Sequence, residues 1–179
     1  MAELIRSLLI ALLCALAIRR FGFMLVRVQG ESMRDTLRTG DRLYVSILSA
    51  RFRRGDVVIC RYPRRKGWFV KRLIALPGDT VSVTMGEVFV NGQPVDAPWP
   101  ARRALYTRPE LRLGEGEYYV LGDNRRSSRD SHSPEVGPVC RPRGVVRAVI
   151  WPPRRIGRIG RTAPDRSITS IPERKDNHV

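Results

Sequence analysis

The sequence predicts a mainly β protein that carries a single helix at its N-terminus. Short runs of β-branched and aromatic residues, separated by glycine and proline, recur between Val26 and Trp151. No long helical period follows residue 27, whereas an uncharged apolar stretch precedes it. The 179 residues contain no second long apolar run, which excludes a multispan membrane protein.

The apolar stretch is residues 7–18, which hold no charge and have arginines on both sides. A helix of this length spans about 18 Å, compared with about 30 Å of bilayer hydrocarbon. The flanking arginines extend its reach towards the headgroups, and residues 21–26 add apolar length. We expect residues 1–27 to be a transmembrane anchor. The alternative is a secretory signal peptide that is cleaved at Ala15-Leu16-Ala17.

Residues 28–160 are expected to form one β-rich domain. Within it, Asn91-Gly92 predicts a tight hairpin, because both residue types accept the positive φ of a type I′ turn. The last strand, residues 144–150, ends at Trp151-Pro152-Pro153. The other expected strands are residues 42–46, 56–62, 68–74, 80–83, 87–90 and 117–121.

Two segments lack a strand pattern. Residues 96–116 are rich in proline and charge, which indicates a surface loop or a small insertion in the domain. Residues 161–179 are polar and aperiodic, so we expect a disordered basic tail.

Charge and composition restrict the partners and the chemistry. There are 33 Lys and Arg against 17 Asp and Glu, and the formal net charge of +16 suits nucleic acid or acidic lipid headgroups. The three cysteines form no Cys-x-x-Cys pair and there are two histidines, so no metal site and no cofactor are predicted. Cys60 and Cys140 have the option of pairing in an oxidising compartment, but the sequence does not bring them together.

Two polar residues are candidates for catalytic chemistry. Ser32 follows Gly30 by two positions, and a glycine there lets the backbone approach a substrate and offer N–H groups to an oxyanion. Lys71 lies in an apolar run, where burial favours the neutral amine that can take a proton from a serine hydroxyl. Taken singly, the more common interpretations are a turn serine and a solvent-facing strand lysine. A third segment, residues 122–132, is dense in short hydroxyl and carboxylate side chains that orient other polar groups.

These three segments, in this order, resemble the bacterial type I signal peptidases, which are membrane-bound Ser/Lys proteases that remove signal peptides from exported proteins. The resemblance runs from about Leu8 to Ile159 and includes the N-terminal anchor and Trp151-Pro152. Its main motifs are Ser32-Met33-x-x-Thr36-Leu37, Lys71-Arg72 followed by Leu76-Pro77-Gly78-Asp79, and Gly122-Asp123-Asn124-Arg125-x-x-Ser128-x-Asp130-Ser131.

The resemblance implies a mechanism in which Ser32 is the nucleophile and Lys71 the general base. It also implies that the Ser32 N–H and the Gly30 region hold the oxyanion, and that Ser128 orients the lysine amine. In this assignment Asp130 braces the site against Arg72.

The same resemblance implies a substrate and a location. The substrate is a preprotein signal peptide, bound extended with small P1 and P3 side chains in shallow apolar pockets. The implied enzyme is a monomer in the cell membrane with a single span, its catalytic domain on the extracytoplasmic side; the positive charge suits anionic membrane lipid, and no specific nucleic acid is expected. The positions that match the substrate-binding residues are Val28, Met33, Leu37, Phe69 and Val70.

Three positions depart from the family pattern. Asp35 stands where proline is usual, Ala75 where glycine is usual, and His132 where arginine is usual. A carboxylate at Asp35, if it lay near Lys71, would favour the ammonium and hinder the base. His132 would weaken an ion pair with Asp130.

Two other functions compete with this interpretation. Self-cleaving repressors share a Ser/Lys pair at similar spacing, but they need a DNA-binding module where this chain has an apolar segment. A degenerate family member that acts as a basic membrane- or nucleic-acid-binding protein is the second alternative, supported by the charge and by Asp35. Against it, aromatic residues do not alternate with the arginines as in a single-strand binder.

Overall fold

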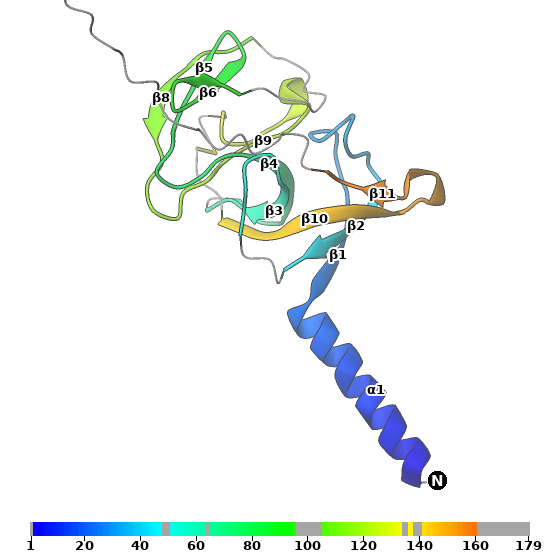
Figure 1. The fold of residues 1–179 in the computed structure, drawn as a ribbon. Coiled ribbons are helices and arrows are strands. Elements are labelled where there is room, and N and C mark those ends of the chain that lie inside the picture. The colour runs from blue at the N-terminus through cyan, green and yellow to red at the C-terminus, as the bar shows by residue number, and fades with distance from the viewer. Residues whose placement is uncertain are drawn as a thin grey trace, which may run out of the picture.

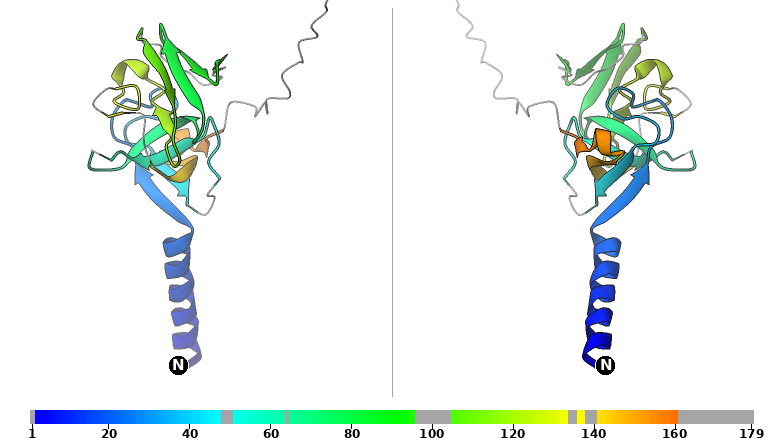
Figure 2. Two further views of the ribbon diagram at one scale, coloured as in Figure 1. Left: turned by 90° about the vertical axis from the view of Figure 1, so that its left-hand side faces the viewer. Right: turned by 90° about the vertical axis from the view of Figure 1, so that its right-hand side faces the viewer.

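The computed structural model contains one N-terminal helix and two antiparallel β-sheets (Figure 1). Helix α1 (Ala2–Phe21) extends away from the β-rich body, and the chain passes from it through Gly22 into the first strand (Figures 1 and 2). The predicted fold class, mainly β with one N-terminal helix, is therefore confirmed. The structure describes residues 2–47, 51–63, 65–95, 105–133, 136–137 and 141–160.

The larger sheet has the strand order β1-β2-β10-β3-β4-β9, with the short strand β11 also paired to β10. Its pairs are antiparallel, and β10 is the long central strand, with register shifts against both neighbours. Such shifts interrupt the regular ladder of hydrogen bonds along β10. The strands are β1 (Phe23–Arg27), β2 (Arg42–Ser46), β3 (Val57–Arg61), β4 (Phe69–Ala75), β9 (Tyr119–Leu121), β10 (Arg141–Trp151) and β11 (Gly157–Arg158).

The smaller sheet has the order β7-β6-β5-β8. It comprises β5 (Thr80–Thr84), β6 (Glu87–Val90), β7 (Gln93–Pro94) and β8 (Arg108–Arg112). The predicted hairpin is confirmed, because Asn91 and Gly92 join β6 to β7 with φ angles of 52° and 75°. Strand β8 lies inside the stretch for which the sequence predicts a loop. Its Pro109 is tolerated because β8 is an edge strand, where a missing N–H breaks no ladder.

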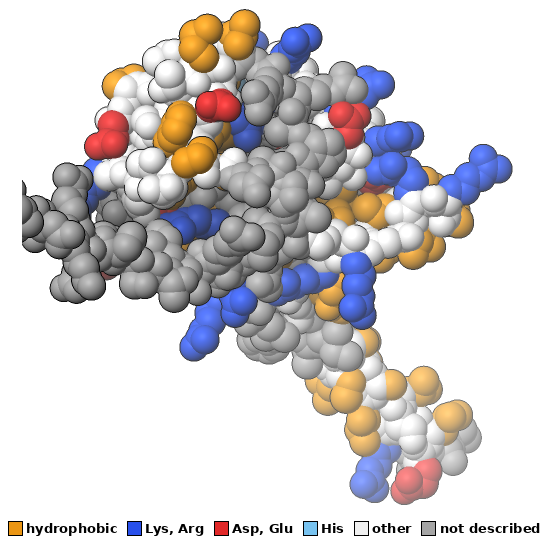
Figure 3. All heavy atoms as spheres, turned by 45° about the horizontal axis from the view of Figure 1, so that its top comes forward, with side chains coloured by type: hydrophobic (Ala, Val, Ile, Leu, Met, Phe, Trp, Pro, Cys, Tyr) orange, Lys and Arg blue, Asp and Glu red, His pale blue; other side chains and the backbone are white. Residues whose placement is uncertain are grey.

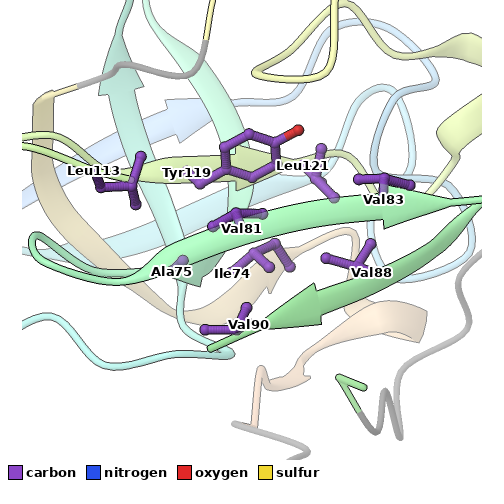
Figure 4. Packing of buried hydrophobic residues seen from close by; sticks show 9 residues of the cluster. All are labelled: Ile74, Ala75, Val81, Val83, Val88, Val90, Leu113, Tyr119 and Leu121. Carbon is purple, nitrogen blue, oxygen red and sulfur yellow. The ribbon is translucent and has the colours of Figure 1, made fainter. Parts of the chain in front are cut away.

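Three apolar clusters hold the body together. One joins the smaller sheet to β4 and β9, and Figure 4 shows its members facing one another: Ile74, Ala75, Val81, Val83, Val88, Val90, Leu113, Tyr119 and Leu121. The other two receive alternate residues of β3: Val57 and Ile59 enter one cluster, Val58 and Cys60 the other. Both faces of β3 are therefore covered, which explains why its first four residues are all apolar and buried, whereas Arg61 at its end is exposed.

Helix α1 presents apolar side chains without burying them. Leu8, for example, is 62% exposed, and other leucines along the helix are similarly open. Within the part of the chain that the structure describes, no helix combines the length and the apolarity needed to cross a bilayer. Two predictions concern residues outside those that the structure describes: the basic tail, residues 161–179, and the pairing of Cys60 with Cys140.

Two short 3-10 helices complete the described part of the fold. The first, η1 (Arg125–Ser127), lies within the third polar segment, directly after Asn124. The second, η2 (Pro153–Arg155), follows β10, and the peptide bond between Trp151 and Pro152 is cis. In η2, Arg155 forms two hydrogen bonds of 2.9 Å to the buried carboxylate of Asp41. This pair ties the end of the larger sheet to the loop that contains Ser32.

Candidate active site

A buried lysine amine is the centre of the site. Lys71 is the third residue of β4, which lies between β3 and β9 in the larger sheet, and only 3% of it is exposed. Its Nζ donates a hydrogen bond of 2.9 Å to Ser128 Oγ. Burial lowers the pKa of Lys71, because removing the ammonium from water is costly; the negative charge of Asp130 opposes this effect but does not cancel it. The predicted apolar setting of this lysine is therefore present, and the alternative of a solvent-facing strand lysine is excluded.

Ser32 lies on the loop between β1 and β2, residues 28–41, which we call the serine loop. This loop packs against the core. Met33 and Leu37 are fully buried and pack with Val28 in one apolar cluster, so the turn between them has little freedom. Gly30 has a φ of +91°, a backbone conformation that residues with a Cβ rarely adopt. Ser32 itself is half-buried at the surface of this loop.

Asn124 connects the serine loop to the third polar segment. Its backbone N–H donates to the carbonyl oxygen of Ser32 at 3.0 Å, and its side-chain Nδ2 donates to the carbonyl oxygen of Glu31 at 3.1 Å. These two bonds hold the peptide groups before and after Ser32, and the first of these groups contains the Ser32 N–H. In the sequence this asparagine is one member of a motif and has no predicted role of its own. A side chain that bonds backbone 93 residues away leaves no local signal in the sequence.

The two loops meet most closely at Gly122. A Cβ placed on this residue would overlap Ser128 Oγ and would lie 2.5 Å from the Ser32 carbonyl oxygen. A glycine is therefore required for the serine loop and the Ser128 segment to approach each other. Among the described residues no hydrogen bond joins the Ser32 hydroxyl to the Lys71 amine, and the two residues are connected through Ser128 and this contact.

Asp130 is a fully buried carboxylate behind Ser128. It accepts hydrogen bonds from the Ser128 hydroxyl and, at 2.6 Å, from the Gly122 N–H. Its other oxygen lies 2.5 Å from Nδ1 of His132. Burial raises the pKa of Asp130, but the contact with His132 and the charge of Lys71 outweigh burial, and the net pKa is lowered. The carboxylate is thus held in its ionised form.

The expected contact between Asp130 and Arg72 is wrong. Arg72 follows Lys71 on β4, and its guanidinium instead forms a buried bidentate pair with Asp123, at 2.8 and 2.7 Å. Thr36 of the serine loop donates to the same carboxylate at 2.5 Å. The reason is geometric: successive residues of a strand point to opposite faces, so Arg72 cannot follow Lys71 towards Asp130. The Arg72–Asp123 pair supports the serine loop rather than the lysine amine.

The positions matched to substrate binding fall into two groups. Val28, Met33 and Leu37 belong to one apolar cluster, against which Val70 packs. Phe69 packs instead with the cluster on the other side of the sheet, where its ring lies 5.2 Å from that of Tyr62. The structure thus brings four of the five positions together near Ser32 and places Phe69 apart from them.

The three departures from the family pattern have distinct settings. Asp35 is exposed and has a φ of +35°, and it is not one of the main charges acting on Lys71. Ala75 is fully buried in the cluster of Figure 4, and it is the register partner of Tyr119 between β4 and β9. His132 keeps its contact with Asp130, and its ring stacks on Tyr106 at 4.6 Å.

The fold and the site together define a class of protein: a β-sheet hydrolase whose site is built from serine, lysine and carboxylate side chains, without a cluster of metal ligands among the described residues. Residues 1–151 match the family described as "Signal peptidase, peptidase S26". The chain therefore belongs to this family of serine endopeptidases.

Individual relatives agree with the family match. The chain is 36% identical to a signal peptidase I of Leptolyngbya laminosa over 171 residues, covering 88% of this chain and 83% of that protein. It is 35% identical to a signal peptidase I of Bacillus licheniformis over 144 residues, covering 73% of this chain and 77% of that protein. A signal peptidase I structure from Enterococcus faecalis V583 aligns with a TM-score of 0.42 at 29% identity, covering 46% of this chain and 86% of that one.

Proposed function

We propose that this enzyme removes N-terminal signal peptides from exported proteins. It cuts the peptide bond after P1, where both P1 and P3 carry small side chains, with Ser32 as nucleophile and Lys71 as general base. The observation that carries the proposal is the buried Lys71 amine, whose pKa is lowered and whose hydrogen bond to Ser128 fixes it beside the serine loop. The names of the relatives, signal peptidase I, support the choice of substrate.

In the first half of the proposed reaction, the neutral Lys71 amine takes the hydroxyl proton of Ser32 while Oγ attacks the scissile carbonyl carbon. The Ser32 N–H stabilises the negative oxygen of the tetrahedral intermediate. When the carbon–nitrogen bond breaks, the lysine ammonium returns the proton to the leaving amine. An ester between Ser32 and the signal peptide remains.

In the second half, water attacks this ester and Lys71 again accepts the proton. The Ser32 oxygen leaves and is reprotonated, which releases the signal peptide and restores the enzyme. No metal or cofactor takes part in these steps.

Ser128 and Asp130 set the direction of the lysine lone pair. The Ser128 hydroxyl donates its hydrogen bond to the Asp130 carboxylate, so its oxygen is left to accept a hydrogen bond from the Lys71 amine. An amine that donates one hydrogen there keeps its lone pair free to point elsewhere. In the proposed mechanism it points to Ser32.

We also propose that α1 attaches the enzyme to the cell membrane as a single span, because the arginines that flank its short apolar stretch can extend to the headgroups on both sides. The N-terminus is then cytoplasmic and the monomeric body lies on the extracytoplasmic side. The support is physical: the helix extends away from the body (Figure 2), it carries a charge-free stretch at residues 7–18, and its leucines are exposed. The net charge of +16 suits anionic lipid as a further partner.

The test is cleavage of a preprotein with an Ala-x-Ala site by the purified chain in detergent. Ser32→Ala and Lys71→Ala should each reduce cleavage to background, whereas Lys66→Ala, which removes an exposed lysine, should cleave like the parent. Ser128→Ala should cut slowly, and its matched control is the exposed neighbour Ser127→Ala. Unchanged cleavage by Lys71→Ala would exclude the proposed mechanism.

A further inference from the structure

A basic hollow lies on the larger sheet, outside the candidate active site. It has a volume of about 630 Å³, within the range of about 300–1,000 Å³ that is typical of small-ligand pockets. We call it the arginine pocket; it is lined by Ile47, Arg61, Tyr62, Pro63, Trp68, Pro142 and Arg143. A second hollow adjoins it, shares Arg61, and adds Arg65 and Lys66. No acidic residue lines either hollow in the described part of the chain.

Two arginines of the pocket share one aromatic ring. The guanidinium of Arg61 lies 4.8 Å from the ring centre of Trp68, and that of Arg143 lies 5.6 Å from it. Both arginines are exposed, and among the described residues neither forms an ion pair. Two like charges held on one ring repel each other, and planar guanidinium groups bind the paired oxygens of an anionic phosphate or carboxylate in a bidentate manner.

The pocket lies at the base of helix α1. Its Ile47 donates a backbone hydrogen bond of 3.3 Å to the carbonyl oxygen of Gly22, the residue directly between the helix and β1. Figure 3 shows Lys and Arg side chains on the underside of the body around the point where the helix leaves it. A bilayer that contains α1 would place its headgroups at this level.

We propose that the arginine pocket binds the phosphate of an anionic phospholipid headgroup, such as phosphatidylglycerol. The two guanidiniums supply the phosphate contacts, and Trp68, 41% exposed, is a residue type enriched at membrane–water interfaces. The proposal rests on the proposed attachment through α1, because that attachment brings the pocket to the lipid surface. It goes beyond general attraction by positive charge, because it assigns the lipid to two particular side chains.

The experiment counts phospholipids that stay bound to the full chain. The chain is purified in a non-ionic detergent, supplied with equal phosphatidylglycerol and phosphatidylcholine, and examined by native mass spectrometry. The parent should retain more phosphatidylglycerol than phosphatidylcholine. Arg61→Gln/Arg143→Gln should lose this preference by about 20- to 30-fold, because each basic side chain at an anionic surface contributes about a factor of five.

Two comparisons distinguish a lipid site at this pocket from general charge attraction and from a site for a soluble anion. The matched variant Arg112→Gln/Arg158→Gln removes the same charge from two exposed strand positions outside the pocket and should keep the preference. Soluble glycerol 3-phosphate at low-millimolar concentration should not displace the lipid. Equal retention by both double variants would overturn the proposal, and so would displacement by glycerol 3-phosphate, which would indicate a site for a soluble anion.

Peptidase activity is measured on the same samples, so that the two proposals can fail separately. In detergent, the arginine-pocket variant should cleave a preprotein like the parent, because neither substituted residue contacts Ser32 or Lys71. A parent that retains phosphatidylglycerol but does not cleave would refute the proposed function and leave the pocket in place. If the double variant unfolds, Arg61→Gln and Arg143→Gln are tested singly, each with an expected loss of about fivefold.

Discussion

Gly122→Ala is the substitution whose effect follows most directly from the geometry of the site. The added Cβ would lie 2.5 Å from the Ser32 carbonyl oxygen and would overlap Ser128 Oγ, whereas Cβ atoms essentially never approach a neighbour within 3.0 Å. The serine loop therefore has to withdraw by at least about 0.5 Å, and the Ser128 hydroxyl has to move as well. Because Ser128 holds the Lys71 amine, both proposed catalytic residues are displaced together.

The expected magnitudes differ for stability and for catalysis. Overpacking of this kind costs about 1–3 kcal/mol of unfolding free energy. A displacement approaching 1 Å between reacting groups can cost about 100-fold in rate, so we expect kcat/KM to fall by roughly that factor. The assay is preprotein cleavage in detergent, with thermal unfolding followed on the same samples.

Gly144→Ala is the matched control. A Cβ at Gly144 would lie 2.8 Å from the Ser46 carbonyl oxygen, a similar clash between β10 and β2. We expect a comparable loss of stability with kcat/KM nearly unchanged. If Gly122→Ala cleaved at the parental rate, or if both variants lost activity equally, the close approach of the two loops would not be the cause.

Further predictions concern the lysine, the buried ion pair and the loop backbone. Activity should rise with pH as Lys71 becomes neutral, with the midpoint below the ordinary lysine pKa of 10.5; a flat kcat/KM profile between about pH 5 and 9 would contradict its role as base. Because the pKa of Lys71 is lowered in the folded state, the unfolded chain binds more protons at pH values below 10.5, and the free energy of unfolding rises with pH. Lys71→Met should therefore raise the unfolding temperature at neutral pH while abolishing cleavage. Asp123→Ala removes the bidentate partner of buried Arg72 and should cost about 3–5 kcal/mol by denaturant unfolding, whereas an unchanged midpoint would show that the pair is dispensable. Asp35→Pro should lower the free energy of unfolding, because proline fixes φ near −65° while this residue has +35°. Asp35→Gly is the tolerated control, and a proline variant that is more stable than the parent would refute the reasoning.

The position of Asp35 also changes the meaning of its departure from the family pattern. A carboxylate at this position would hinder Lys71 only if the two lay close together. The main charges acting on Lys71 come from Asp130, Arg65 and Asp123 instead. The departure therefore concerns the backbone conformation of the serine loop more than the charge at the lysine.

The fold class, the hairpin at Asn91-Gly92 and the apolar surroundings of Lys71 could be predicted from the sequence. Each depends on neighbours within a few positions, since alternation, turn residues and flanking side chains act locally. The order of the three polar segments was equally visible, and it indicated the family to which the chain belongs.

The tertiary structure alone decided which polar groups meet. Arg72 binds Asp123 and not Asp130, although the three residues lie in neighbouring motifs, because strand register and pleat direction set the partner of a side chain. Strand β8 forms despite Pro109 because it pairs at a sheet edge with β5, a partner that no local pattern specifies. The need for glycine at position 122 arises only where two loops, distant in the sequence, come into contact.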